Sequence, residues 1–358
     1  MNRLSFAAVT ALLCLSCSTP LPELRILVGT YTEGTSAEGV YLYSFNSETA
    51  DVSLLSRAPA GNPSFVIADE DNTRAYAVNE FNDGREGLSS FSINNDIVSL
   101  QSSVLFKDEG FNGKDPCNLL RFGSSLISSN YTGGTVSAYR LNDDGSIAEF
   151  EQFFGLEGSH MHCAVPSPDK KFIFVTDLGN DCIHRFEPDT DGPLSRHATA
   201  WKHEREEQFG PRHMVFSGDG RFAYLLCELG DKLVVFSYVD GALVPIQTVT
   251  AYEGEGHGSA DIHISPDGRF LYTSHRLKDD GIAIWAIDED SGIVNPVGYQ
   301  ATGIHPRNFA ISPDGRFLLC ACRDSNCIEI YSIDTDNGSL SPTGRIIELG
   351  APVCVQFL

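Results

Sequence analysis

The chain repeats itself about every fifty residues, and this periodicity constrains the fold more than any other feature of the sequence. Four segments have nearly the same sequence and begin 50, 48 and 47 residues apart: SPDKKFIF at 167–174, SGDGRFAY at 217–224, SPDGRFLY at 265–272 and SPDGRFLL at 312–319. Three weaker members extend the series. The last residue of each of the seven aligned segments is taken as the anchor of its unit, and the anchors are residues 27, 76, 126, 174, 224, 272 and 319. Self-similarity at this period is typical of repeat architectures such as propellers.

Each repeat reads as four antiparallel strands. In the unit with anchor 272, strands expected at 260–265 and 270–274 are joined by the turn Pro266-Asp267-Gly268, in which proline fixes φ and glycine accepts positive φ. Two further strands are expected at 281–288 and 293–299. No helical period of 3.6 residues is present, which excludes an α-solenoid. Seven such units predict an all-β fold, a seven-bladed β-propeller.

The two ends of the chain predict how the ring closes. The first unit begins at RILVGTY (25–31) and lacks an inner strand. The last segment, APVCVQFL (351–358), resembles the inner-strand openings HPRNFAIS and NPSFVIAD of other units. The C-terminal strand is therefore expected to be the innermost strand of the N-terminal blade, which closes the ring and hides its sheet edges.

The chain is strongly acidic, with a formal net charge of −23. Because phosphate backbones require a basic face, this charge argues against a nucleic-acid partner. Arginines that cluster in so acidic a protein are expected to serve a local purpose. The apolar content of 42% is enough for a large core, and we expect one propeller domain over residues 21–358.

Residues 1–20 predict an export signal and tether that lie outside the fold. One basic residue, Arg3, precedes an apolar run over 4–15 that is too short to span a bilayer as a helix. The segment ending at Cys17 resembles a bacterial lipoprotein box, with Cys14 where leucine is usual, so Cys17 is the expected lipidation site. Plain secretion and an uncleaved anchor are the alternatives. We expect an exported lipoprotein that faces the periplasm or the cell surface and meets a membrane only through this anchor.

Eight cysteines follow Cys17, and their positions predict free buried thiols. Cys182 and Cys327 occupy the same place in two units, in NDCIHRF and SNCIEIY, as core-filling residues would. Cys320 and Cys322 flank one strand residue and are too close to bridge well. No C-x-x-C pair occurs, so a zinc site is not expected. No other metal and no cofactor are predicted.

Propeller geometry selects one set of positions around the central channel. The first strand of each blade runs away from one face and the second returns to it, so the start of the first and the end of the second meet at one rim. The start positions, twelve residues before the anchor, are Ser64, His162, Arg212, Ala260 and Arg307, with Asp115 to Asn118 in the shorter third unit. The end positions, four residues after the anchor, are Tyr31, Glu80, Asn130, Leu178, Glu228, Arg276 and Arg323.

These rim positions are mostly polar and differ from unit to unit, whereas a role common to all blades would select the same residue in each. Four arginines, two glutamates and one histidine predict an ionic site with affinity for an anion. The alternative is a salt-bridge ring that only fills the channel mouth, and Glu80 and Arg323 would suit such a rim pair. Four histidines outside the rim positions are interpreted as strand-packing or loop residues: His160, His213, His257 and His263.

Six segments stand out beyond the repeat itself: GTYT at 29–32, SNYTGGTVSAYRL at 129–141, HCA at 162–164, GPRHMVF at 210–216, ADIHISPDGRFLYTSHR at 260–276 and HPRNFAISPDGRFLL at 305–319. Together they resemble the lactonase-type seven-bladed propellers, a family that includes 6-phosphogluconolactonases and fungal carboxy-muconate cyclases. The likeness covers essentially the whole chain after residue 24.

The resemblance implies an active site of one histidine, two arginines and one glutamate. By motif these are His162 in HCA, Arg212 in GPR, Glu228 in CEL and Arg276 in SHR, and all four belong to the rim set. Other rim residues are then expected to bind substrate: Glu80, Asn130, Arg307 and Arg323.

The expected activity is metal-free hydrolysis of a small anionic sugar lactone, as in 6-phosphogluconolactonases. His162 or Glu228 would act as general base and acid, while Arg212 and Arg276 would hold the anionic group of the substrate or the oxyanion. Two rivals are a lactonising lyase or isomerase of the muconate type and a non-catalytic exported binding propeller. Because 6-phosphogluconolactone is made in the cytoplasm, export would point to a different sugar lactone in vivo.

Overall fold

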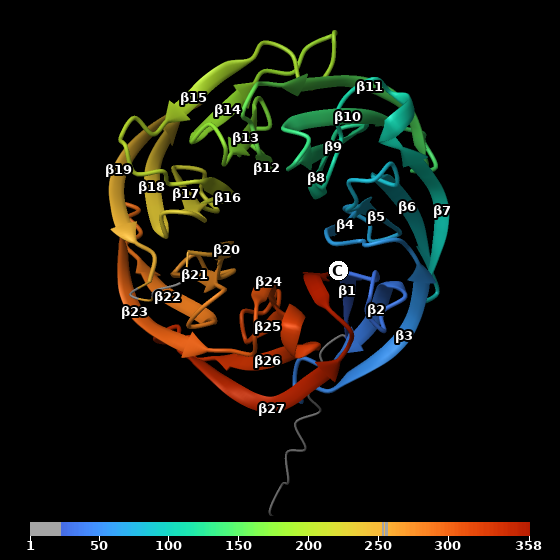
Figure 1. The fold of residues 1–358 in the computed structure, drawn as a ribbon. Coiled ribbons are helices and arrows are strands. Elements are labelled where there is room, and N and C mark those ends of the chain that lie inside the picture. The colour runs from blue at the N-terminus through green and yellow to red at the C-terminus, as the bar shows by residue number, and fades with distance from the viewer. Residues whose placement is uncertain (1–22, 253, 255–256) are drawn as a thin grey trace, which may run out of the picture.

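Seven four-stranded antiparallel sheets surround a central axis in the computed structural model, which describes residues 23–252, 254 and 257–358 (Figure 1). In each sheet the innermost strand faces the axis and the outermost lies at the rim of the disc (Figure 1). This confirms the all-β, seven-bladed propeller. The expected signal and tether of residues 1–20 lie outside the described residues.

The strands follow one another around the ring in chain order. Their bounds are β1 (Leu24–Thr30), β2 (Gly39–Phe45), β3 (Val52–Pro59), β4 (Val66–Ala68), β5 (Arg74–Asn79), β6 (Gly87–Asn94), β7 (Ile97–Leu105), β8 (Pro116–Phe122), β9 (Ser125–Asn130), β10 (Thr135–Leu141), β11 (Ile147–Gly155), β12 (Met161–Pro166), β13 (Ile173–Asp177), β14 (Cys182–Phe186), β15 (Ala198–Lys202), β16 (Pro211–Phe216), β17 (Phe222–Cys227), β18 (Lys232–Val239), β19 (Ala242–Thr250), β20 (Ser259–Ile264), β21 (Phe270–His275), β22 (Gly281–Ile287), β23 (Val294–Ala301), β24 (Pro306–Ile311), β25 (Phe317–Cys322), β26 (Cys327–Ile333), β27 (Leu340–Glu348) and β28 (Pro352–Phe357). Two short 3₁₀ helices, η1 (Phe106–Asp108) and η2 (Arg323–Ser325), interrupt the described loops.

The repeated SPDGRF motif makes the turn between the first two strands of a blade and also ties that blade to the next. Between β20 and β21, the hydroxyl of Ser265 donates to Asp267 Oδ1 at 2.6 Å and accepts from the backbone N–H of Phe270 at 2.9 Å. Gly268 has a φ of +76°, a conformation that glycine adopts without strain. Arg269 then donates to the carbonyl oxygens of Thr335 and Asp336 in the following blade, at 2.9 and 3.1 Å. The motif is therefore selected by turn geometry and by blade-to-blade contact.

The C-terminal strand closes the ring, as the sequence predicts. Strand β28 pairs antiparallel with β1, with Val355 opposite Val28, and the first sheet has the order β28-β1-β2-β3. Both valines are buried. Figure 1 shows the C-terminus beside β1, close to the axis. The innermost strand of this blade is therefore supplied from the other end of the chain.

Apolar side chains fill the wedges between neighbouring blades. One such cluster joins Tyr224 and Val235 of one sheet to Leu271 and Trp285 of the next. The eight described cysteines are unpaired and all but Cys327 are buried, which confirms the expectation of free thiols. No helix in the described part of the chain is long and apolar enough to cross a membrane.

Candidate active site

The residues at the channel mouth come from the two positions of each blade that the repeat selects. His162 and Arg212 lie one residue into the inner strands β12 and β16, whereas Glu228 and Arg276 directly follow the second strands β17 and β21. His162, Arg212 and Arg276 are almost fully buried, and the Glu228 side chain is 20% exposed. All four predicted catalytic residues therefore lie at one end of the channel.

The Glu228 carboxylate is shared by two arginines from adjacent blades. Arg212 Nε donates to Oε2 and Arg276 Nη2 donates to Oε1, each at 2.9 Å. Burial alone would raise the pKa of Glu228, but the guanidinium groups of Arg212 and Arg276 hold that pKa below its usual value. Glu228 is therefore ionised at neutral pH, and both of its oxygens accept hydrogen bonds.

Each of these arginines is also fixed by backbone carbonyls. Arg212 Nη1 donates to the carbonyl of Ala260, and Arg276 Nε donates to that of Gly258 at 3.0 Å. Arg276 Nη1 lies 3.3 Å from Nε2 of His305. Burial and the nearby charge of Arg212 lower the pKa of Arg276 to about 9, so it remains a cation at neutral pH. A rigid, partly desolvated pair of cations of this kind favours an anionic ligand.

Arg307 belongs to a second group at the same mouth. Glu80 accepts hydrogen bonds from the hydroxyls of Tyr31 and Ser64, the former at 2.8 Å. Arg307 Nη2 lies 3.6 Å from Glu80 Oε2, and its guanidinium carbon lies 5.5 Å from the centre of the Tyr31 ring. Among the described residues, the Arg307 side chain donates no hydrogen bond. Arg307 therefore has fewer protein partners than Arg212 and Arg276.

His162 is neutral and has an unpartnered nitrogen. Burial and the charge of Arg212 lower the pKa of His162 well below 6.5. Its Nδ1 atom is buried and has no hydrogen-bond partner among the described residues. The ring of Tyr131 contacts it edge-on at 5.7 Å between ring centres, and that of His213 at 5.1 Å. A buried polar atom without a partner is a place where a ligand or a water would bind.

The structure corrects the mouth position predicted for the third unit. Asn130 donates through Nδ2 to Thr135 at 3.0 Å and Ser137 at 3.3 Å, within its own blade. In the strand pairing it is opposite Thr135, as Asp177 is opposite Cys182, so it corresponds to the last residue of a second strand and not to the residue after it. The predicted anchor of this unit, which lacks the SPDGRF motif, is therefore wrong by one residue. A shift of one residue along a strand turns the side chain to another side.

Tyr131 therefore takes the mouth position that the sequence assigned to Asn130. It lies over His160, with ring centres 4.7 Å apart, and meets His162 edge-on. An alignment of the units on the last residue of the second strand, which precedes Glu228 and Arg276, would have placed Tyr131 at the mouth. Arg323 lies at η2, where its side chain is 31% exposed and pairs with Asp324 at 2.6 Å. Asp324 also lies 3.5 Å from His305, and among the described residues Arg323 makes no ion pair with Glu228.

A buried histidine–aspartate pair lies one residue deeper in the channel than Arg212. His213 Nδ1 is 2.7 Å from Asp261 Oδ1, and His263 Nε2 is 2.9 Å from Asp261 Oδ2. Burial lowers the pKa of His213 to about 4, and its Nε2 atom is buried without a partner among the described residues. Sequence reasoning interpreted His213 and His263 as packing residues. The signal that could have found the pair is Asp261, a buried carboxylate within the inner strand β20.

Fold and site together define a class: a seven-bladed propeller whose channel mouth holds arginines, carboxylates and a neutral histidine. The chain belongs to the family described as Lactonase, 7-bladed beta-propeller, whose sequence profile matches residues 25–357. This confirms the family resemblance seen in the sequence.

Individual relatives agree over nearly the whole length. A 6-phosphogluconolactonase of Formosa agariphila is 32% identical over 88% of this chain and 94% of its own. Among solved structures, a candidate 6-phosphogluconolactonase of Bacteroides uniformis is 43% identical with a TM-score of 0.88, covering 94% of this chain and 99% of that one. The periplasmic gluconolactonase of Pseudomonas aeruginosa is 29% identical with a TM-score of 0.85 and the same coverage of both chains.

Proposed function

We propose that this protein is a lactonase of the 6-phosphogluconolactonase type, which adds water to the ring ester of a sugar lactone and releases the open-chain sugar acid. The single observation that carries the chemistry is a neutral, unpartnered His162 beside two arginines that converge on Glu228. Membership of the lactonase family and relatives named 6-phosphogluconolactonase support the substrate class.

His162 is the proposed general base. A neutral imidazole can accept the proton of a water molecule that attacks the lactone carbonyl, and the same imidazolium can return that proton to the departing ring alkoxide. Water adds to the carbonyl carbon, the ring C–O bond breaks, and the products are a carboxylic acid and an alcohol on one chain. The charge of Arg212, which lowers the pKa of His162 before substrate binds, also favours return of the proton.

Glu228 is proposed to position the arginines and not to act as the base. Its pKa is held low and both oxygens accept from guanidinium groups, so it is a weak proton acceptor. Hydrogen bonds to the carbonyl oxygens of Ala260 and Gly258 hold the guanidinium groups of Arg212 and Arg276 in place before substrate binds, which also fixes the direction of their remaining N–H donors. Donors fixed in advance stabilise the oxyanion of a tetrahedral intermediate without reorganisation.

Arg307 is proposed to bind the anionic group of the substrate. Three buried or half-buried arginines face two glutamates at the mouth, which leaves an excess of positive charge. Arg307 has the fewest partners of the three. A phosphate or carboxylate on the sugar would supply the missing acceptor.

The deciding experiment is a hydrolysis screen of the purified protein against phosphorylated and plain aldonolactones, followed by proton release in a pH-stat. We expect the parent protein to hydrolyse a lactone faster than the spontaneous rate, and we expect His162→Gln to lose this turnover. Binding of a lactone, measured by calorimetry, without any turnover would instead identify a binding propeller. Turnover that survives in His162→Gln and disappears in Glu228→Gln would reverse the roles of these two residues.

We further propose that the protein is exported and lipidated at Cys17. Support comes from the short apolar run over residues 4–15 and the lipobox-like ending at Cys17. The Pseudomonas aeruginosa neighbour is described as periplasmic, which is compatible with this location. An exported lactonase would act on a sugar lactone present outside the cytoplasm.

A further inference from the structure

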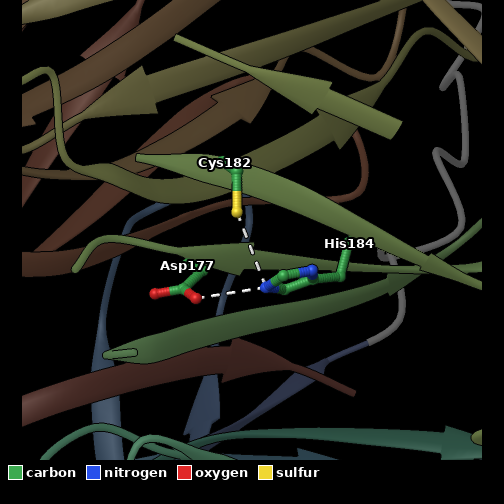
Figure 2. A group of neighbouring side chains, drawn as sticks. All are labelled: Asp177, Cys182 and His184. Atoms are coloured by element: carbon green, nitrogen blue, oxygen red, sulfur yellow. Dashed lines mark hydrogen bonds and ion pairs between the residues drawn. The ribbon is translucent and has the colours of Figure 1, made fainter. Parts of the chain in front are cut away.

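A carboxylate, a thiol and an imidazole converge inside the blade formed by β12–β15, away from the channel mouth. Figure 2 shows Asp177, Cys182 and His184 pointing toward one another, with both marked contacts meeting at one ring nitrogen. His184 Nε2 lies 3.1 Å from Asp177 Oδ2 and 3.6 Å from Cys182 Sγ. The three ligand atoms lie within 4.8 Å of one another, and all three residues are buried.

We propose that Asp177, Cys182 and His184 form a binding site for a thiophilic divalent cation, with Zn²⁺ as the best match. Zinc takes nitrogen and carboxylate ligands at about 2.0–2.2 Å and thiolate at about 2.3 Å in tetrahedral geometry. Tetrahedral angles at those lengths place nitrogen and sulfur roughly 3.5 Å apart and nitrogen and oxygen roughly 3.3 Å apart. The two distances present here come within a few tenths of an ångström of that arrangement.

Residues around the three ligands already orient them. His184 Nδ1 lies 2.9 Å from Nε2 of His197, the kind of second contact that fixes which ring nitrogen faces a metal. Asp177 Oδ2 accepts from Ser159 Oγ at 2.6 Å and from Asn180 Nδ2 at 3.1 Å. Asn180 is partly exposed and lies in the turn between β13 and β14.

Comparison with the equivalent place in another blade separates this group from an ordinary hydrogen-bonded network. Residues at the same three positions of β9 and β10 are Asn130, Thr135 and Ser137, which satisfy one another through neutral hydrogen bonds. A thiol also occupies the equivalent position of the β24–β27 blade, at Cys327, so the imidazole of His184 is what distinguishes the blade of β12–β15. The blade of β12–β15 joins a carboxylate, a thiol and an imidazole at these three positions.

Binding balances as follows. The metal takes a lone pair from His184 Nε2, one from Asp177 Oδ2 and one from the Cys182 thiolate, and the thiol proton passes to solvent. The hydrogen of His184 is then on Nδ1 and is donated to Nε2 of His197, whose own ring hydrogen is on Nδ1. One position remains for a water or for Ser159. This inference is independent of the lactonase activity, because none of the three metal ligands is a residue of the channel mouth.

The test is metal binding by the intact protein. Protein stripped with a chelator and refolded with Co²⁺ should bind one equivalent and show a thiolate-to-cobalt charge-transfer band, and Zn²⁺ should displace Co²⁺ and raise Tm. We expect Cys182→Ser to lose the band and to weaken binding at least about tenfold. The matched control is Cys327→Ser, which removes the thiol at the equivalent position of the β24–β27 blade and should bind cobalt as the parent does.

Two outcomes would overturn the proposal. The first is a folded parent protein that binds no Co²⁺ or Zn²⁺, which leaves only a hydrogen-bonded network. The second is a charge-transfer band that survives Cys182→Ser and disappears in Cys327→Ser, which places the ion elsewhere. If Cys182→Ser does not fold, His197→Gln provides the same comparison, because it should weaken binding while leaving all three ligands in place.

Discussion

Replacing Arg276 with lysine separates a catalytic mouth from a structural salt-bridge ring. The guanidinium of Arg276 bonds Glu228 at 2.9 Å and Gly258 at 3.0 Å through two different nitrogens, with His305 at 3.3 Å from the third. A lysine ammonium is a single point donor at the end of a flexible chain. It can keep the contact to Glu228, but it cannot also keep those to Gly258 and His305, so the cation is no longer held in one orientation toward a substrate.

The magnitude follows from the lost bond. One hydrogen bond to a charged group contributes about 1.5–3 kcal/mol. If that bond forms to the substrate anion or to the oxyanion, kcat/KM should fall about 10- to 100-fold in Arg276→Lys, and by a similar factor in Arg212→Lys. Arg323→Lys is the control, since Arg323 pairs with Asp324 and makes no ion pair with Glu228 among the described residues, and it should change kcat/KM little.

The assay measures kcat/KM by proton release and Tm by thermal unfolding on all three variants. Lower kcat/KM with Tm close to that of the parent supports the active site. Lower Tm with unchanged kcat/KM would show that the arginines form a structural ring, and the reasoning would then be wrong.

Ring closure, buried histidines and the N-terminal cysteine can each be tested as well. Removal of residues 351–358 should cause aggregation or failure to fold, because β1 loses its inner partner, β28, and the edge of β1 is exposed; cooperative melting near the parent Tm would refute ring closure. Acid should destabilise the protein, because burial lowers the pKa of His213 to about 4 and that of His275 to about 3, so between pH 6.5 and 4 the unfolded chain binds protons that the folded chain does not. The free energy of unfolding, measured with urea, should fall by roughly 1.4 kcal/mol per histidine for each pH unit in that window, and a flat profile would contradict this. Cys17→Ala should abolish partition into a detergent phase without loss of activity, and unchanged partition would exclude lipidation.

The sequence predicted the mouth because equivalent positions can be compared between repeats. Where the SPDGRF motif fixes the alignment, as for Arg212, Glu228, Arg276 and Arg307, the structure brings these side chains to the channel mouth. Where the motif is absent, as in the third unit, an error of one residue chose Asn130 in place of Tyr131. Local turn chemistry thus limited how far the prediction could extend.

The sequence by itself determined the number of blades, the closure by the C-terminal strand and most of the residues that lie at the channel mouth. It could do so because strand alternation and turn motifs are local properties that repeat along the chain. Only the tertiary structure decided which charges pair: Glu228 is shared by arginines of two blades, His213 meets Asp261, and Asp177, Cys182 and His184 converge inside one blade. These contacts join residues up to 48 positions apart, and a partner at that separation is set by how the blades pack around the axis.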